Sequence, residues 1–284
     1  MANLKELRNR IKSVSSTMQI TSAMKMVSAA KLSKAQDAIQ SMRPYSEKLT
    51  ELLQSLSASL EGEQASPYSE QREISKVLVV SISSNRGLAG AFNSNIIKGS
   101  KSLVEETNAS VDFITLGKKA NDILSKEFNV IENNNEIFDK LTYDNAAEIA
   151  EKLMQLFVAG TYDKVVLVYN QFINAATQKV AKEQLLPILP IETTGDVALD
   201  YIFEPSKEEI VEELIPKSLK VQFYKALRDS FASEHGARMT AMHKATDNAT
   251  ELRDSLKLSY NKARQAAITN EILEIVGGAE ALNN

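Results

Sequence analysis

Two long stretches of the chain are almost free of the residues that interrupt helices. Residues 2–60 contain no glycine and one proline, Pro44, and residues 217–276 contain one glycine, Gly236, and no proline. Glycine and proline both destabilise the interior of a helix, so these stretches favour helices much longer than those of an ordinary domain. Because a helix rises about 1.5 Å per residue, each would extend for roughly 90 Å.

Small and apolar residues recur at alternate spacings of three and four in the C-terminal stretch. The row comprises Met242, Ala245, Ala249, Leu252, Leu256, Ser259, Ala263, Ala266, Asn270 and Leu273. A seven-residue repeat of this length is typical of a left-handed coiled coil. Since alanine and serine bury little area, the row predicts a slim rod that needs further partners around it.

The N-terminal stretch has the same spacing. Its row comprises Leu4, Leu7, Ile11, Val14 and Met18, and we expect Met24, Val27 and Leu32 to continue it on a broader face. Both long helices attach to the same middle region, one entering and one leaving, so the sequence predicts an antiparallel pair. The alternative is a helical hairpin that folds back on the domain.

The middle of the chain alternates strands and helices. The predicted elements are a strand at 76–83, a helix near 91–106, a strand at 111–117, helices at 118–128 and 144–160, a strand at 163–172 and an edge strand at 177–188. This order is typical of a mostly parallel sheet with helices on its faces. A capping box at 206–209 predicts a short helix that leads into the long one.

The sequence therefore predicts an α/β fold. A Rossmann-like, mostly parallel sheet domain is inserted between two long helices that form an antiparallel left-handed coiled coil. We expect the division to fall at 1–61 for the N-terminal coiled-coil helix, 62–215 for the Rossmann-like domain and 216–284 for the C-terminal coiled-coil helix.

The turn after the first strand, in "VLVVSISSNRGLAGAFNSN" (77–95), is placed like a phosphate-binding loop. Gly87 and Gly90 are only three residues apart, however, and no Lys–Ser or Lys–Thr pair follows. Neither the P-loop pattern nor the dinucleotide pattern is matched. A small anion site stays open as an alternative, but the turn favours a surface feature that presents Arg86 to a protein partner.

Other chemistry is sparse. The chain has no cysteine, and His235 and His243 lack zinc-ligand spacing, so we expect both on a helix surface and no metal, cofactor or catalytic site. Aliphatic runs such as 165–168 are too short to cross a bilayer, and the N-terminus does not resemble a secretory signal. Residues 1–34 carry seven basic residues against one acid, Glu6. Without interleaved aromatic residues, this strip suits an acidic protein partner at least as well as a nucleic acid.

Four segments together resemble the gamma subunit of F-type ATP synthases. They are "ITSAMKMVSAAKL" (20–32), "SSNRGLAGAFNSN" (83–95), "SEHGARMTAMHKATDNATE" (233–251) and "NKARQAAITNEILEIVGGAEAL" (261–282). The resemblance covers essentially the whole chain. It departs from the family at Asn85, where aspartate is common, and at Ala89, where cysteine or asparagine is usual.

The resemblance implies a central rotor shaft with no catalytic residue. Such a shaft stands inside a hexameric ring of alpha and beta subunits, carries an epsilon subunit and is attached to the c-ring, without itself crossing the membrane. By its asymmetry it couples proton flow to ATP synthesis or hydrolysis at the beta subunits. The implied location is peripheral, on the cytoplasmic face of a bacterial membrane, or alternatively on the matrix face in an organelle.

The resemblance also implies which residues contact partners. Met24 and Lys25 match the neck of the coil, and Arg86, Lys98 and Lys101 match positions that face an acidic beta-subunit loop. The upper shaft gripped by the ring is matched by Arg264, Gln265, Thr269 and Glu271. Two rival hypotheses are a non-rotary coiled-coil adaptor with a Rossmann-like head and an α/β enzyme with helical extensions.

Overall fold

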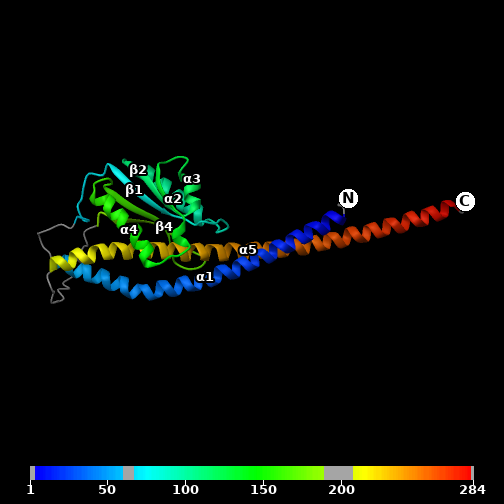
Figure 1. Cartoon of the computed structure of the whole chain (residues 1–284). Coiled ribbons are helices and arrows are strands. Elements are labelled where there is room, and N and C mark those ends of the chain that lie inside the picture. Colours follow the sequence, from blue (N-terminus) through cyan, green and yellow to red (C-terminus); the bar gives the residue numbers. More distant parts are fainter. Residues whose placement is uncertain (1–3, 60–66, 189–206, 283–284) are drawn as a thin grey trace. The chain divides into compact units, whose positions relative to one another are not determined.

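The computed structural model describes residues 4–59, 67–188 and 207–282 of the 284-residue chain (Figure 1). Its packing forms two compact units. One combines residues 1–28 with 239–284, and the other comprises residues 29–238. Two helices, α1 (Leu4–Ser59) and α5 (Lys207–Leu282), contribute residues to both units.

In the first unit, α1 and α5 form an antiparallel pair, as predicted. Arg8 bonds to Tyr260, Met18 contacts Arg253 and Thr21 bonds to Thr246, so residue numbers rise along one helix as they fall along the other. The N-terminal row is half-buried or buried, with Leu7 only 7% exposed. Beyond Met18 the row continues through the buried hydroxyl residues Thr21 and Ser28.

The expected C-terminal row is correct at five positions, Met242, Ala245, Ala249, Leu256 and Ala263. It is wrong at the other five, which are exposed: Leu252, Ser259, Ala266, Asn270 and Leu273. Buried or half-buried positions recur every seven residues at Met242, Ala249, Leu256 and Ala263. The intervening contacts come from Thr246, Arg253 and Tyr260, each one residue later than predicted. Leu252 is 51% exposed, and Val27 of α1 is 58% exposed. The prediction chose positions by their apolar character. The contacts between the helices are made instead by long or hydroxyl-bearing side chains, and the neighbouring leucine and valine face outward.

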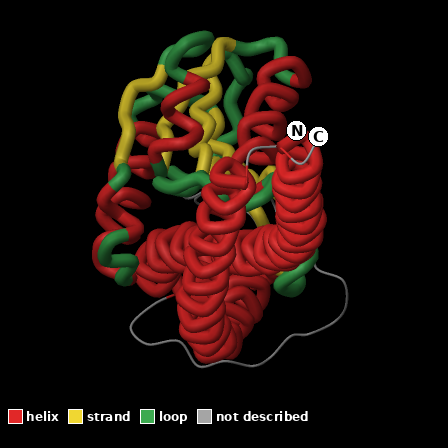
Figure 2. The backbone as a smooth tube through the Cα atoms, turned by 90° about the vertical axis from the view of Figure 1, so that its right-hand side faces the viewer, coloured by secondary structure: helices red, strands yellow, loops and turns green. Residues whose placement is uncertain are grey.

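The second unit contains a five-stranded sheet in the order β3-β2-β1-β4-β5. Its strands are drawn in yellow in Figure 2. The strands are β1 (Lys76–Ile82), β2 (Ser110–Leu116), β3 (Val130–Asn134), β4 (Lys164–Phe172) and β5 (Gln178–Leu186). The first four are parallel, and β5 is the predicted added edge strand, antiparallel to β4. The edge strand β3 was not predicted, because its polar sequence lacks a hydrophobic strand pattern.

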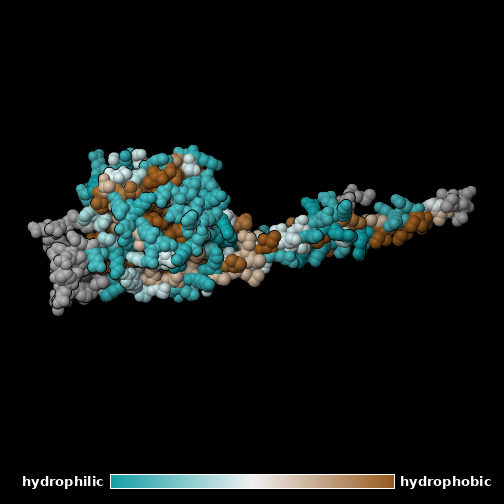
Figure 3. Space-filling view, in the orientation of Figure 1, coloured by the Kyte–Doolittle hydropathy of each residue, from teal (hydrophilic) through white to brown (hydrophobic). Residues whose placement is uncertain are grey.

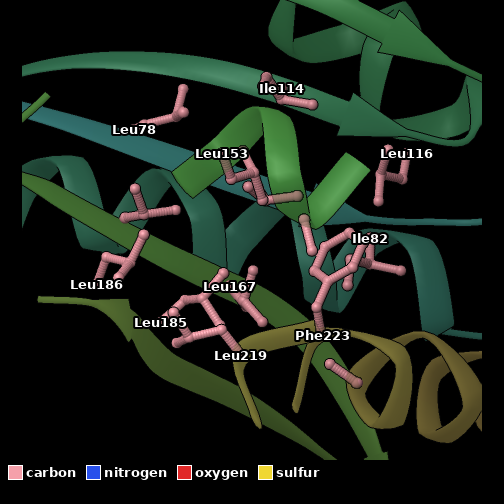
Figure 4. Close-up of a cluster of buried hydrophobic side chains, with 14 of the residues drawn as sticks. Leu78, Ile82, Ile114, Leu116, Leu153, Leu167, Leu185, Leu186, Leu219 and Phe223 are labelled. Atoms are coloured by element: carbon pink, nitrogen blue, oxygen red, sulfur yellow. The ribbon is translucent and has the colours of Figure 1, made fainter. Parts of the chain in front are cut away.

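Helices cover both faces of the sheet. They are α2 (Phe92–Glu106), α3 (Lys118–Leu124), α4 (Tyr143–Val158) and the first half of α5. Side chains alternate along a strand, so β1 contributes to two cores. Leu78 and Ile82 pack with Leu153 of α4 and Phe223 of α5 (Figure 4), whereas Val79 packs on the opposite face with residues of α2 and α3. The alternation of strands and helices is confirmed.

The N-terminal boundary of α5 differs from the prediction of a short helix followed by a long one. A single helix begins at Lys207 and continues through Pro216. The capping residue proposed for it, Ser206, lies outside the described residues. The functional division of the chain at 61/62 and 215/216 stays a prediction.

Candidate functional site

The turn that connects β1 to α2 begins where two strands approach closely. Gly117, at the end of β2, has a φ of 102°, and a Cβ atom there would lie 2.4 Å from the carbonyl oxygen of Ser83. The Ser83 hydroxyl accepts a hydrogen bond from the backbone N–H of Ala120 at 3.0 Å. The start of the turn is therefore fastened to the β2–α3 connection, and only glycine fits at position 117.

Asn85 extends this fastening to a third strand. Its side-chain amide donates to the carbonyl oxygen of Asn135, just after β3, at 2.7 Å. Its side-chain oxygen accepts from the backbone N–H of Lys118 at 3.1 Å. An ionised aspartate, common in the family, could make only the second bond, because it has no donor. Asn85 thus uses both functions of its amide to hold the turn.

The inside of the turn is filled by the chain itself. The side-chain oxygen of Asn93 accepts from the backbone N–H of Ser84 at 3.0 Å, and the Ser84 hydroxyl donates to the carbonyl oxygen of Arg86 at 2.6 Å. Ala89 and Phe92 form a buried cluster with Ala237 of α5. Leu88 has a positive φ of 61° and is 64% exposed. The turn therefore directs its interior groups at each other and its tip outward, which argues against the anion-site alternative.

Helix α5 lies across the position where α/β sheets usually bind ligands. That position is the carboxyl end of the two neighbouring strands between which the strand order reverses, which in this sheet are β1 and β4. The hydroxyl of Ser230 donates to Ile82 of β1 at 3.5 Å, and that of Ser233 donates to Asn170 of β4 at 2.9 Å. At Gly236 a Cβ atom would lie 3.2 Å from Ala175 in the β4–β5 hairpin. The chain's own helix thus occupies the crevice, and the absence of a nucleotide site stays a prediction.

A buried ion pair follows on the same helix. Arg238 donates to the Glu234 carboxylate at 2.6 Å, and their side chains are only 8% and 10% exposed. The other edge of the guanidinium donates to the carbonyl oxygens of Arg86 and Gly87 at 3.1 and 3.3 Å. Burial raises the pKa of Glu234, and the charge of Arg238 opposes this effect.

His235 lies between these two residues and corrects an expectation. It is 5% exposed rather than on a helix surface, and its ring packs edge-on against Phe231 at 4.5 Å between centroids. Burial lowers its pKa to about 3, with the positive charge of Arg238 as a second cause. The other histidine, His243, is exposed as expected and lies 3.3 Å from Asp247. The burial of His235 comes from tertiary packing around α5, which local sequence does not reveal.

Two of the three cations predicted near the turn are exposed. Arg86 lies on the turn and Lys98 on α2, and both side chains face solvent. Lys101 is half-buried, and its ammonium donates to both carboxylate oxygens of Glu127, at 2.7 and 2.6 Å. Lys101 therefore forms an intramolecular ion pair with Glu127, a contact that the sequence did not indicate.

The remaining predicted contact residues lie in the first unit. Met24 and Lys25 are half-buried on α1, close in sequence to the Thr21–Thr246 contact. Arg264, Gln265, Thr269 and Glu271 are all exposed on α5, and the Thr269 hydroxyl donates to the Gln265 carbonyl at 2.9 Å. Sequence reasoning assigned no role to Glu234 or Arg238. The available signal was Gly236, which lies between them and is the one glycine of residues 217–276.

Among the described residues, no helix lies beside the last part of α5. Residues 264–279 are exposed along their whole length. Large apolar side chains lie among them, visible as brown patches near the end of α5 in Figure 3: Ile268, Ile272, Leu273, Ile275 and Val276. Exposed apolar groups at this density are typical of a surface that a protein partner covers.

The described residues contain neither a membrane-spanning helix nor a metal-binding cluster. No helix within 4–59, 67–188 or 207–282 is long and apolar enough to span a membrane. In the same part of the chain, no three histidine, cysteine, aspartate or glutamate side chains are grouped so that they could hold a metal ion.

The fold defines an α/β protein whose sheet domain is inserted between the two helices of an antiparallel coiled coil. A family model described as ATP synthase matches residues 3–282. An ATP synthase gamma chain from Christiangramia forsetii is 70% identical over 285 aligned positions, which cover 100% of both chains. The chain therefore belongs to the ATP synthase gamma chain family, as its four motifs indicated.

Solved structures share the fold. The central stalk and c-ring structure of Tetrahymena thermophila mitochondrial ATP synthase contains a chain that is 27% identical, with a TM-score of 0.60 over 80% of this chain and 99% of that one. A chain in the OSCP/F1/c-ring structure of the Euglena gracilis enzyme is 24% identical, with a TM-score of 0.72 over 98% of this chain and 94% of that one. The predicted fold class is confirmed.

Proposed function

We propose that this chain is the central-stalk rotor subunit of a bacterial proton-translocating ATP synthase. It couples rotation of a c-ring, driven by proton flow, to ATP synthesis or hydrolysis at the beta subunits. The full-length similarity to a gamma chain supports this function over a non-rotary adaptor.

The observation that carries the proposal is the unpaired end of α5. Residues 264–279 continue as helix beyond the Arg8–Tyr260 hydrogen bond, are exposed along their whole length and carry large apolar side chains. A single exposed helix of this kind is unfavourable in water but suits a bearing enclosed by an apolar sleeve. The alpha–beta ring would supply that sleeve, with Arg264, Gln265, Thr269 and Glu271 at its contact surface.

Coupling requires that the shaft present different surfaces to each beta subunit. A ligand or partner shifts a conformational equilibrium only through differential contacts with the two states. Two different helices, with Met24 and Lys25 on α1 and only α5 at the tip, make the shaft asymmetric about its axis. Rotation would therefore favour a different beta conformation at each angle.

The exposed turn supplies a second contact. Arg86 and Lys98 are placed to meet carboxylates of a beta-subunit loop, and Arg86 can take a carboxylate in two parallel bonds. Lys101 would bind the same loop only if its ion pair with Glu127 were broken. We therefore rank Arg86 first among these cations.

The remaining functional assignments follow from the rotor role. The subunit is non-catalytic and binds no cofactor or nucleic acid. Its partners are the alpha and beta subunits, the epsilon subunit and the c-ring. It is peripheral on the cytoplasmic face of the cell membrane.

A rotation assay tests the proposal. The chain has no cysteine, so Asn108→Cys in an exposed loop provides a single attachment point for a bead. The alpha–beta complex is fixed to a surface and supplied with ATP. We expect stepwise rotation in one direction. A complex that hydrolyses ATP while its bead stays still would favour the adaptor.

A further inference from the structure

The turn that presents Arg86 is held by α5 as well as by its own strand. The backbone oxygens of Arg86 and Gly87 both accept from the guanidinium of Arg238, which is 151 or more residues away in sequence. The Arg86 side chain itself is exposed. Arg238 therefore binds the main chain of the turn at Arg86 and Gly87 and leaves the Arg86 side chain available to a partner.

Arg238 has little freedom of its own. Its side chain is 8% exposed, and Glu234, one helical turn earlier, holds the opposite edge of the guanidinium at 2.6 Å. The planar group is thus oriented by a carboxylate on one edge and satisfied by two carbonyl oxygens on the other. Arginine suits this arrangement because its donors have a rigid, forked geometry that lysine lacks.

The hydrogen bonds from Arg238 matter because the tip of the turn is otherwise exposed. Asn85 and Ser83 fasten its start, and Phe92 is buried at its end. Between them Leu88 is 64% exposed and has a positive φ of 61°. Within the turn the Ser84 hydroxyl donates to the Arg86 carbonyl oxygen at 2.6 Å, and Arg238 adds the bonds to Arg86 and Gly87 that come from α5.

We propose that the buried Glu234–Arg238 pair is the positioning device for the 84–90 turn and sets the orientation in which Arg86 meets its protein partner. This inference rests on the proposed function for the role of Arg86, but not for the geometry. Arg238 is a positioning residue and contacts the partner through Arg86 alone.

The decisive variant removes both charges. Replacing a buried ion pair with apolar residues of similar size often preserves stability, whereas removing one member leaves an unpaired buried charge. Glu234→Met with Arg238→Met should therefore keep the fold and lose the bonds to the turn. Arg238→Lys, which keeps the ion pair but not the fork, should have an intermediate effect.

Motion of the turn can be read directly in the full chain. A spin label on Leu88→Cys reports the turn, and a label on Glu105→Cys, exposed on α2, serves as reference. In the double variant we expect the Leu88 label to move severalfold faster, the Glu105 label to be unchanged and the melting temperature to stay close to that of the parent. Lys220→Met, which breaks an exposed ion pair of α5 with Glu151, is the matched control and should alter neither label.

The assembled complex provides the functional readout, ATP-driven proton pumping. We expect the double variant to lower it severalfold and Arg238→Lys to lower it less. Unchanged motion of the Leu88 label in both variants overturns the inference. A mobile turn with normal pumping also overturns it, provided that Arg86→Glu impairs pumping in the same membranes. If Arg86→Glu has no effect, the proposed contact of Arg86 fails instead, and the label alone decides whether the pair positions the turn.

Discussion

The hydroxyl oxygens of Thr21 and Thr246 lie 2.8 Å apart across the two helices of the coiled coil. Each hydroxyl also lies within bonding distance of a backbone carbonyl of its own helix, that of Met18 at 3.1 Å and that of Met242 at 2.8 Å. Thr21 is buried. A polar contact at a buried seam position fixes the register of two helices that alanine-rich positions hold only weakly.

This contact predicts coupling between the two threonines. Thr21→Val and Thr246→Val should each destabilise the chain, since a buried hydroxyl loses a partner. The double variant should cost less than the sum of the two, with a coupling free energy of about 0.5–1 kcal/mol. Denaturant unfolding of the full chain measures the cycle. Thr17→Val, at an exposed position of α1, is the control, and strict additivity of the two seam variants would contradict the idea.

Reversing the charge at the exposed turn should weaken coupling without unfolding the chain. Arg86→Lys should already reduce ATP-driven proton pumping, because lysine cannot bind a carboxylate through two parallel bonds, and Arg86→Glu should reduce it further. The melting temperature of the isolated chain should hardly change. Lys126→Glu, an exposed charge reversal after α3, is the control. Early melting of both Arg86 variants, with full activity at low temperature, would make Arg86 a structural residue instead.

A lysine at position 24 should impair coupling more than assembly. Met24 is half-buried on α1, and an added ammonium there can form a new ion pair with a beta-subunit carboxylate. One such charged bond is worth about 1.5–3 kcal/mol, enough to slow the step that breaks it. The measurement is the number of protons pumped per ATP hydrolysed. Met26→Lys places the same charge on a residue that is 62% exposed and should have a smaller effect; equal effects would reject the neck-specific explanation.

Gly117→Ala should destabilise the second unit by at least about 2 kcal/mol. The backbone there has a φ of 102°, and the new Cβ atom would lie 2.4 Å from the Ser83 oxygen, so both strain and a clash oppose it. Gly87→Ala meets open space and serves as the matched control. Thermal melting compares the two. Similar melting temperatures for both variants would mean that the β2–α3 connection yields more easily than its contacts imply.

His235 should make the chain less stable in mild acid. The unfolded chain takes up a proton near pH 6.5, whereas burial keeps the folded-state pKa of His235 at about 3. The free energy of unfolding therefore falls as pH drops below 6.5, by up to about 1.4 kcal/mol per pH unit. Among the groups facing His235, Arg238 and Lys31 reinforce this effect, while the raised pKa of Glu234 acts in the opposite direction.

The comparison of two histidine variants isolates this contribution. His235→Gln should flatten the dependence of unfolding free energy on pH between 6.5 and 5. His243→Gln replaces the other histidine of the chain, at an exposed position, and is the matched control. A slope that persists in His235→Gln would assign the acid sensitivity to other groups.

Local sequence patterns were sufficient to predict much of this fold. The seven-residue spacing of Leu7 and its neighbours, the β-branched run that becomes β1 and the scarcity of glycine in both flanks each depend on residues close together in the chain. Periodicity and propensity act at that range, so the long helices, the parallel strands and the family motifs could be predicted from the residues alone.

The contacts that define the candidate site come from residues far apart in sequence. Arg253 rather than Leu252 faces Met18, His235 is buried, and Arg238 holds a turn 151 residues away. No local pattern distinguishes these residues from their neighbours, because burial and hydrogen bonding depend on which segments pack against them. Folding brought a helix onto the carboxyl ends of β1 and β4, and that packing gave Glu234 and Arg238 their partners.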